Sequence, residues 1–366
     1  MTLDATAPDV VGDPPSCARR GGPPFASPAR FRVLLAALAV AVLGAVILAV
    51  SVGSVTVPLG TVWRVVAARA GLGDAVADPV HEQIVWELRV PRALLGLMAG
   101  AALALSGTAI QAVARNPLGD PYLLGIVPGA ALGAVVVVVS GGGALGGVSL
   151  GAAAFVGASL AFVATFAMGR EAGRWPPARL VLAGVAVGSA CSAATFYLQT
   201  QATPNQVQRV LFWSLGSVAG AKWSQLALPA VVVAVAGAWL VLQARRLNVL
   251  ALGDDEAATL GVDMRRFPFQ VMAASALLAA VVVGVAGGIG FVGLVVPHLC
   301  RLLVGSDHRR VVPCAVLIGA VFLTGVDIVA RVAQRPAELP LGVVTAAIGA
   351  PFLLWLMRSS ARRAAA

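Results

Sequence analysis

Asp327 and Arg331 are opposite charges four positions apart in an otherwise apolar stretch of the chain. On a helix this spacing brings the two side chains to one face, where they can form an ion pair. Because an unpaired charge is costly in apolar surroundings, one interpretation is a neutralised pair at the edge of a membrane. The alternative is that Arg331 faces outward and binds an acidic partner, together with Arg89 and Arg92 of an R-V-P-R segment. Snorkelling to the membrane interface is the other explanation for that segment.

Gln111 is a polar residue in the second apolar stretch, shortly before an R-N-P-L-G-D-P segment. The two prolines of that segment exclude regular helix and predict a tight turn that Asn116 caps or lines. The fifth apolar stretch is the most polar one, and it carries Ser189, Ser192 and Thr195. Such residues most often form hydrogen bonds between membrane helices. The more specific hypothesis is that they line a wet translocation path.

The segment 247–267, LNVLALGDDEAATLGVDMRRF, is amphipathic and carries both charge signs between the sixth and seventh apolar runs. Gly253 and Gly261 are expected to interrupt it. The acidic residues that begin at Asp254 suit a helix N-terminus, where the helix dipole favours negative charge. The pattern predicts two short helices joined by a glycine. We interpret them as a compact knob that docks into the groove of a partner protein, the alternative being a solvated connector.

Several kinds of reactive site are missing from the sequence. The only lysine, Lys222, follows Ala221, so there is no G-x-x-x-x-G-K-[ST] phosphate loop, and any ATP must be hydrolysed by another subunit. Asp327 is the only acidic residue well inside an apolar run, which disfavours an ion-coupled secondary carrier. The histidines and cysteines are dispersed, so we expect no metal or other cofactor in this chain. A membrane enzyme is disfavoured for the same reason.

These residues belong to a chain of 366 residues, of which 59% are hydrophobic and 11% charged, with a mean hydropathy of +0.91. Soluble domains are about 45–50% apolar and about 25% charged, so the sequence predicts an all-α, polytopic membrane protein. Apolar runs of about 20 residues predict about ten transmembrane helices. Gly287, Gly288, Gly290 and Pro297 interrupt the eighth run, for which a re-entrant segment is the alternative. The runs are 31–52, 91–112, 121–140, 147–169, 178–200, 226–243, 268–288, 289–305, 311–331 and 341–358.

The basic residues predict the orientation of these helices. With the N-terminus inside, most of the 26 lysine and arginine residues fall on the cytoplasmic side, so both termini are expected in the cytoplasm. This bias accounts for most of the net charge of +10, and no basic stretch interleaved with aromatic residues suggests nucleic-acid binding. We expect a disordered, proline-rich cytosolic tail over 1–30, a transmembrane domain over 31–360 and a cytosolic tail over 361–366.

Seven motifs, in this order along residues 31–360, resemble the FecCD-type permease family of ABC importers for ferric siderophores, haem and vitamin B12. The resemblance implies a vitamin B12 importer permease-like fold of ten spans and a homodimer, or a pair with a paralogous permease, around a central path. It also implies two cytosolic ATPase subunits, which hold ATP and magnesium, and an extracytoplasmic substrate-binding protein. The motifs are RVPRALLG (89–96), SGTAIQAVARNPLGDPYLLG (106–125), LALGDDEAATLG (250–261), GFVGLVVPHLCR (290–301), DHR (307–309), DIVAR (327–331) and ELPLGVVTAAIGAP (338–351).

The resemblance also implies roles for particular residues. Arg89, Arg92 and Arg331 match the family's outer arginines, which bind glutamates of the binding protein. Asn116 and Leu118 match part of the inner gate, to whose pathway we add Gln111, Ser189, Ser192 and Thr195. The two-helix loop matches the element that couples the permease to the ATPase. Its residues are Val249, Leu252, Gly253, Asp254, Glu256, Ala257, Leu260 and Gly261.

The sequence therefore predicts a multi-pass permease subunit of a binding-protein-dependent ABC importer in the plasma (inner) membrane, and not an enzyme. Alternating access driven by the separate ATPase is the expected mechanism. The expected cargo is a ferric siderophore, because neutral walls of small residues suit a bulky chelate that binds weakly. A cobalamin-type relative carries a small hydroxyl-bearing pair where this chain has Pro177 and Ala178. Cobalamin, haem or another large cofactor is the alternative cargo, and a secondary carrier is the alternative class.

Overall fold

The computed structural model describes residues 24–364 except 26, 54, 73–77, 142–148, 172–174 and 335–336. Most of the predicted tail 1–30 lies outside the described residues. Residues 28–30 form the first turn of α1 (Pro28–Ser51), which begins after Ser27 because the Ser27 hydroxyl caps the backbone N–H of Arg30. At the other end, residues 361–364 continue the last helix, α15 (Leu341–Ala364).

Each of the ten predicted apolar runs corresponds to a helix in the described part of the chain, and the all-α prediction is confirmed there. Seven helical stretches are long and apolar enough to cross a membrane. Of the three remaining apolar helices, Ile126–Val139 and Val292–Val304 are shorter because non-helical backbone interrupts their runs, and the apolar part of the last helix is Leu341–Leu356. The ten are α1, α4 (Val90–Ala114), α5 (Ile126–Val139), α6 (Leu150–Gly169), α7 (Pro177–Thr200), α9 (Ala227–Leu242), α12 (Phe267–Ala286), α13 (Val292–Val304), α14 (His308–Val332) and α15.

The eighth predicted span is only partly helical. Its helix, α13, has 13 residues, about 20 Å at 1.5 Å per residue, whereas the hydrocarbon core is about 30 Å thick. The residues before it, 287–291, are not helical, and both Gly287 and Phe291 have positive φ angles of 71° and 67°. The glycines that interrupt this run in the sequence therefore mark a real break inside the bundle.

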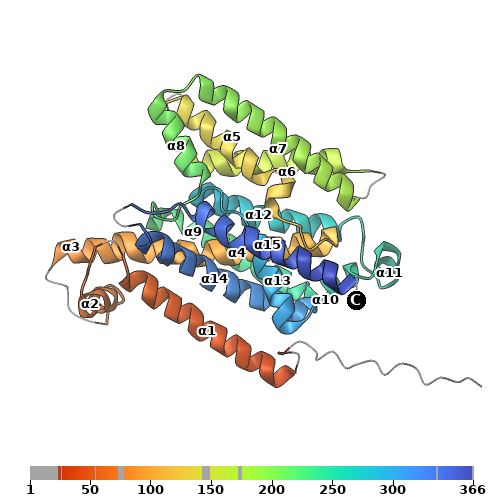
Figure 1. Cartoon of the computed structure of the whole chain (residues 1–366), viewed down its shortest axis with the longest axis horizontal. Helices are drawn as coiled ribbons and strands as arrows, with labels where there is room; N and C mark the ends of the chain where they lie inside the picture. The colour runs from red at the N-terminus through yellow and green to blue at the C-terminus, as the bar shows by residue number, and fades with distance from the viewer. Residues whose placement is uncertain are drawn as a thin grey trace, which may run out of the picture.

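The helices form two groups, which Figure 1 shows one above the other. Helices α5, α6, α7 and α8 (Pro204–Ser214) make the smaller group, and α4 lies inside the larger one, packed against α12, α13 and α14. Glycine permits the closest approaches: a β-carbon on Gly107 would lie 1.8 Å from the carbonyl oxygen of Gly293, and one on Gly100 would lie 2.0 Å from that of Gly319. Small residues are what let membrane helices pack this tightly.

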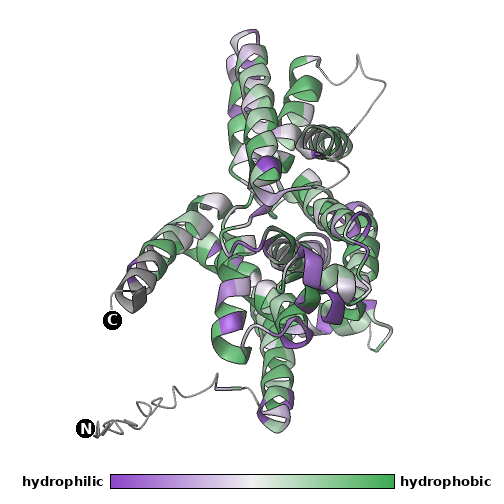
Figure 2. Ribbon diagram, turned by 90° about the vertical axis from the view of Figure 1, so that its right-hand side faces the viewer, coloured by the Kyte–Doolittle hydropathy of each residue, from purple (hydrophilic) through white to green (hydrophobic). Residues whose placement is uncertain are grey.

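Short helices decorate the two ends of the bundle. The α2 end, on the left of Figure 1, carries α2 (Leu59–Arg69), α3 (Pro79–Glu82) and the π-helical turn Gln83–Arg89, which runs directly into α4. The α11 end, on the right, carries α10 (Ala244–Leu250) and α11 (Asp254–Thr259). Hydrophobic residues dominate the long helices in Figure 2. This distribution is that expected of a polytopic membrane protein, whose lipid-facing surface is apolar.

Candidate functional site

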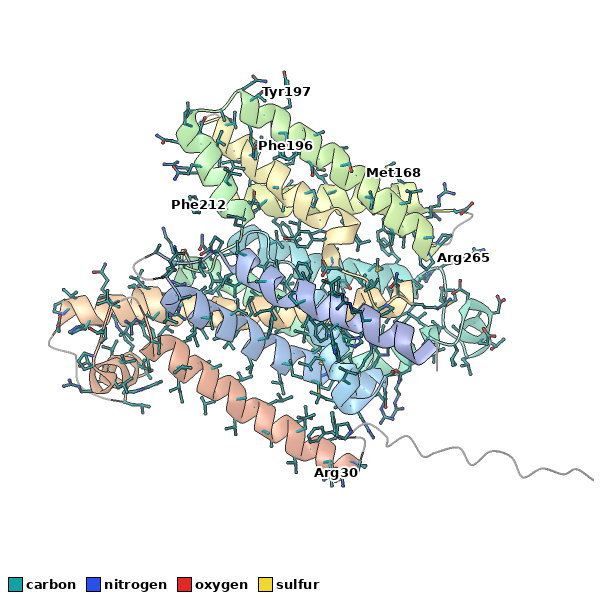
Figure 3. The ribbon with its side chains drawn as sticks, viewed as in Figure 1. Arg30, Met168, Phe196, Tyr197, Phe212 and Arg265 are labelled. Atoms are coloured by element: carbon teal, nitrogen blue, oxygen red, sulfur yellow. The ribbon has the colours of Figure 1, made fainter. Side chains whose placement is uncertain are left out.

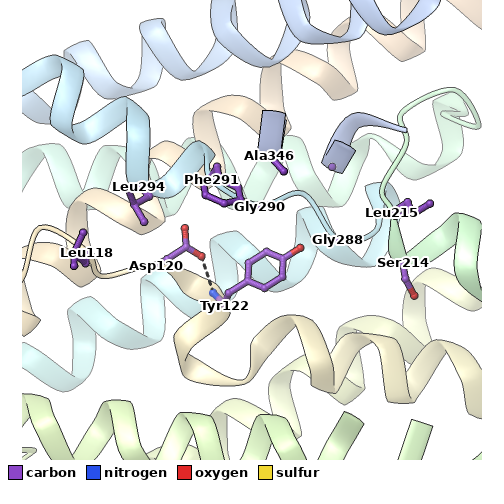
Figure 4. Close-up of a pocket in the computed structure, with 11 residues that line it drawn as sticks. Leu118, Asp120, Tyr122, Ser214, Leu215, Gly288, Gly290, Phe291, Leu294 and Ala346 are labelled. Carbon is purple, nitrogen blue, oxygen red and sulfur yellow. Dashed lines mark hydrogen bonds between the residues drawn. The ribbon is translucent and has the colours of Figure 1, made fainter. Parts of the chain in front are cut away.

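A pocket of about 440 Å³ is lined by residues of both helix groups and of the segments that join them. We call it the central pocket. Its walls include Leu118 and Tyr122 from the segment between α4 and α5, Leu215 after α8, and Phe291 and Leu294 at the start of α13. Figure 4 shows the Tyr122 ring extending across it toward Gly288, with Leu118 at one end and Leu215 at the other. The pocket thus lies where several helices are interrupted.

A crossing of three backbone segments, which we call the backbone junction, borders the central pocket. Ser217 N–H donates to Ala286 O at 2.8 Å, Leu341 N–H to Gly216 O at 3.0 Å, and Gly342 N–H to Leu215 O at 2.9 Å. These bonds join the chain after α8, the end of α12 and the start of α15.

Glycine is required at the backbone junction. Gly216 has a φ of 73°, and a β-carbon on Gly287 would lie 2.1 Å from the carbonyl oxygen of Trp213. Non-helical backbone is tolerated at membrane depth only where it is buried in protein or lines a cavity. Discontinuous helices of this kind mark the binding site in many transporters. The central pocket is therefore the candidate pathway of this chain.

Asp120 adds a carboxylate to the wall of the central pocket. It is buried, and its Oδ1 accepts a hydrogen bond of 2.9 Å from the backbone N–H of Tyr122, the dashed line in Figure 4. This bond caps the short 3-10 turn Pro121–Leu124. Asp120 was not among the predicted pathway residues, although its place in the N-P-L-G-D-P segment, between two helix-breaking prolines, could have indicated it.

The predicted gate and pathway residues occupy different surroundings. Leu118 lines the central pocket, and Asn116 is exposed and accepts a hydrogen bond from Leu118 N–H at 2.9 Å. Gln111 is buried. Its side-chain N–H groups donate to Gly119 O at 3.2 Å and to Gly293 O at 3.1 Å, and its side-chain oxygen accepts from Arg301 Nη1. Gln111 thus ties the turn after α4 to α13, a link between segments that local sequence does not reveal.

The polar residues of α7 are not brought to the central pocket. Helix α7 packs on α5 and α6, where Thr195 is buried, Ser192 is half-buried and Ser189 is exposed. The Thr195 hydroxyl oxygen is buried without a hydrogen-bond partner. Large side chains of the same helix point away from the chain, with Phe196 and Tyr197 both 66% exposed (Figure 3). One face of α7 is therefore left uncovered by the residues that the structure describes.

The three predicted docking arginines gather around one cavity of about 310 Å³ at the α2 end. Arg92 bridges two carboxylates, with Nη2 2.8 Å from Asp327 Oδ1 and 2.8 Å from Glu338 Oε2. Arg331 Nη2 lies 2.7 Å from Asp327 Oδ2, one helical turn away. The intrahelical pair, one of the two interpretations drawn from the spacing, is present, and the Arg331 side chain is 2% exposed instead of facing outward.

Arg89 and Arg331 both donate hydrogen bonds to the end of α1. Arg89 Nη1 donates to Ser51 O at 2.8 Å, and Arg331 Nη1 donates to Ala49 O at 2.9 Å and to Val52 O at 3.0 Å. The last carbonyls of a helix lack partners within it and attract positive charge. Since α1 has no basic residue in its own last turn, two distant arginines satisfy this requirement. The local sequence pattern gave no sign of it.

The loop between α9 and α12 has the predicted form of two short helices. Gly253, with a φ of 126°, separates α10 from α11, and Gly261, with a φ of 81°, follows the second helix. Ala257 is buried and anchors α11, Val249 and Asp254 are half-buried, and Glu256 is exposed. Two large apolar side chains of the loop face away from the bundle: Leu252 is 60% exposed and Leu260 is 61% exposed. The loop therefore offers an apolar surface at the α11 end.

Two side chains, those of Arg115 and Asn248, fix this loop to the bundle through polar contacts. Arg115, at the end of α4, donates from Nε to Leu250 O at 2.6 Å and pairs through Nη2 with Asp254. Asn248 of α10 donates to Asp307 Oδ1 at 2.7 Å, in the turn between α13 and α14.

Asp307 is held in its charged form by these surroundings. Burial alone would raise its pKa, but hydrogen bonds from Asn248 and the backbone of Arg309, with the charges of Arg309 and Arg310, bring the pKa below its ordinary value. Sequence reasoning assigned no role to Arg115, Asn248 or Asp307, since each contact joins segments far apart in the chain.

Comparison with known proteins gives consistent matches. The model of the FecCD transport family matches residues 34–359. The vitamin B12 import system permease protein BtuC of Klebsiella pneumoniae subsp. pneumoniae is 43% identical over 280 residues, 76% of this chain and 83% of that protein. The cobalamin import system permease protein BtuC of Halobacterium salinarum is 41% identical over 281 residues, 77% of this chain and 75% of that protein.

A solved structure has the same fold. It is described as an inward-facing conformation of a putative metal-chelate type ABC transporter. It is similar with a TM-score of 0.77 and 30% identity, over 90% of this chain and 99% of the other.

Proposed function

Because this chain belongs to the FecCD transport family, the membrane permease components of ABC importers, we propose that it is the permease subunit of a cobalamin importer. The support is the 43% and 41% identity to permeases named for vitamin B12 and cobalamin import. Cobalamin, the alternative cargo of the sequence analysis, thus takes precedence over a ferric siderophore.

The central pocket is the observation that carries the proposal. It lies among interrupted helices and is lined mainly by apolar and small residues, with Asp120 as the acidic group in its wall. Such a wall suits a large cargo that must bind weakly and leave again. A second permease subunit is proposed beside the uncovered face of α7, because Ser189 is exposed on that face and could hydrogen-bond to a neighbouring membrane helix. In this arrangement, alternating access passes cargo between the two subunits.

The ATPase is proposed to bind at the α11 end. The exposed Leu252 and Leu260 would enter its groove, while Ala257 and Leu250 keep the loop attached to the bundle. ATP and magnesium would bind to that partner. The arginines Arg245, Arg246, Arg265 and Arg266 lie near the same end, which supports a cytoplasmic location for it and for both termini, in a plasma (inner) membrane.

The extracytoplasmic binding protein is proposed to dock at the α2 end, at the cavity of Arg89, Arg92 and Arg331. Asp327 and Glu338 already neutralise part of this charge. Asp327 is deeply buried, whereas the Glu338 side chain is 30% exposed. A carboxylate of the partner would therefore compete with Glu338 for Arg92, and Asp327 would stay in place.

The experiment is transport by liposomes that contain the chain with its ATPase, with the binding protein outside. We expect ATP-dependent uptake of cyanocobalamin, persisting when the proton gradient is collapsed. A ferric hydroxamate siderophore is the matched competitor, since the similarity to a metal-chelate type transporter favours it as the second candidate cargo. Uptake of the siderophore alone would replace the proposed cargo, and uptake that follows the proton gradient without ATP would contradict the importer itself.

A further inference from the structure

Arg115 connects the α10–α11 loop to the turn that borders the central pocket. Its Nε donates to Leu250 O at 2.6 Å, and its Nη2 pairs with Asp254 at the start of α11. One guanidinium thus contacts both short helices. Among contacts of the loop with the transmembrane bundle, this one reaches the segment that leads to Leu118.

The backbone at Arg115 is unusual and directs the side chain to the loop. Arg115 follows the last residue of α4 with φ 48° and ψ 31°, one of two non-glycine residues with positive φ in the described part of the chain. Arginine gains nothing locally from this left-handed conformation, which asparagine or glycine adopts more easily. The two contacts of Arg115 with the loop offset the cost of this backbone conformation.

The turn after Arg115 is short and internally hydrogen-bonded. Asn116 accepts from Leu118 N–H at 2.9 Å through its side chain and from Gly119 N–H at 3.0 Å through its carbonyl. Leu118 then lines the central pocket. A displacement of Arg115 is therefore expected to move Leu118, because Pro117 and the two hydrogen bonds to Asn116 hold the turn between them together.

Room for such a displacement exists beside the ion pair. A cavity of about 260 Å³ is lined by Arg115, Asp254 and Leu250 and also by Trp175 and Met264. The pair itself is partly solvated, with side-chain exposures of 35% for Arg115 and 45% for Asp254. Solvated ion pairs contribute little to stability. We therefore interpret the Arg115–Asp254 pair as a mechanical connection between α11 and the end of α4.

We propose that Arg115 is a positioning residue that transmits movement of the α10–α11 loop to Leu118, so that the motion of a partner ATPase opens or closes the central pocket at this end. The proposal rests on the proposed importer function. The Arg115 guanidinium is then the link between the α10–α11 loop and the turn that contains Leu118.

The test separates transport from ATP hydrolysis in the reconstituted complex. Arg115→Asn removes the guanidinium and keeps a residue that tolerates φ 48°, so the turn is preserved. Asp254→Asn removes the negative charge that pairs with Arg115. Because Asp254 lies on the solvent-exposed loop, this substitution is not expected to misfold the membrane domain. Arg266→Gln is the matched control, because it removes another loop ion pair, to Asp263 at 3.6 Å, that does not reach the turn.

We expect cargo moved per ATP to fall about fivefold or more in Arg115→Asn and Asp254→Asn, with the double variant no worse than either. Arg266→Gln should retain the wild-type ratio, and Arg115→Lys should recover part of it. An unchanged ratio in Arg115→Asn would overturn the proposal, as would equal losses of uptake and hydrolysis, which indicate a lost ATPase contact. Absence of ATP-dependent uptake in the wild-type complex would count against the importer function instead.

Discussion

Arg331 Nη2 lies 2.7 Å from Asp327 Oδ2 in an ion pair, and both side chains are 2% exposed. Arg92 contacts the other carboxylate oxygen of Asp327 at 2.8 Å. One buried carboxylate thus holds two arginines from different helices, α4 and α14. These helices share a long contact inside the bundle, so the acid fixes their relative position at the α2 end.

Asp327→Asn should therefore destabilise the protein strongly. It leaves Arg331 without its buried counter-charge, and removing one partner of a buried pair costs about 3–5 kcal/mol. Unfolding in detergent, followed by thermal or denaturant titration, measures the loss. Glu82→Gln is the control, because it breaks the exposed pair with Arg69 and should cost about 1 kcal/mol or less. If Asp327→Asn and the wild type are equally stable, the Asp327–Arg331 pair does not stabilise the fold.

Glu338→Gln should tighten docking of the binding protein. It frees one side of Arg92 while Asp327 remains bound to the other, so a carboxylate of the partner meets less competition. We expect affinity to rise about threefold or more at low salt and the gain to shrink at high salt. Titration of the labelled binding protein onto the permease in nanodiscs measures this. If Glu338→Gln binds the partner no more tightly than the control Glu82→Gln, the arginine cavity is not part of the docking surface.

Gly253→Val should abolish ATP-dependent uptake while membrane insertion persists. The φ of 126° at Gly253 is accessible only to glycine, so a β-branched residue there strains the backbone at the start of α11. The start of α11 must then rearrange, which displaces the exposed Leu260. Gly220→Val is the matched control, since a β-carbon at Gly220 meets nothing within 4 Å. Full uptake by Gly253→Val would mean that the loop shape is not needed for coupling.

Asp307 should make stability depend on pH in the acidic range. Its pKa is lowered in the folded chain, so the unfolded state takes up its proton first as the pH falls. The stabilisation is complete above the unfolded pKa of about 3.9 and disappears as pH falls through the lower folded pKa. Melting curves of wild type and Asp307→Asn between about pH 7 and pH 3 should therefore converge at the acidic end. A difference that grows below about pH 4 would contradict this sign.

Hydropathy and helix-breaking residues are enough to predict most of the fold. The ten apolar helices follow from run length, because each must bury its backbone polar groups internally in lipid. The interruption before α13 is also visible, at Gly287 and Gly288. By contrast, α2 and α8 are 11 residues each and too short to register as spans. Periodicity alone does not predict such helices.

The candidate site is less accessible to sequence reasoning. Leu118 is found by its motif, but Arg89 and Arg331 satisfy carbonyls of α1 that lie 39 and 282 residues away. Gln111 and Arg115 likewise act through contacts with distant segments. Side-chain type and local spacing state what a residue can bind, and only the packing of helices decides which of its possible partners is within reach.

The backbone junction also limits how this protein can change in evolution. Its hydrogen bonds are made by main-chain groups, and a β-carbon on Gly216 or Gly287 would collide with neighbouring backbone, so substitutions of these two glycines distort the scaffold. Tyr122, Leu215 and Phe291 instead reach the central pocket with their side chains. We therefore expect substitutions at these few positions to change cargo preference without altering the backbone around the pocket.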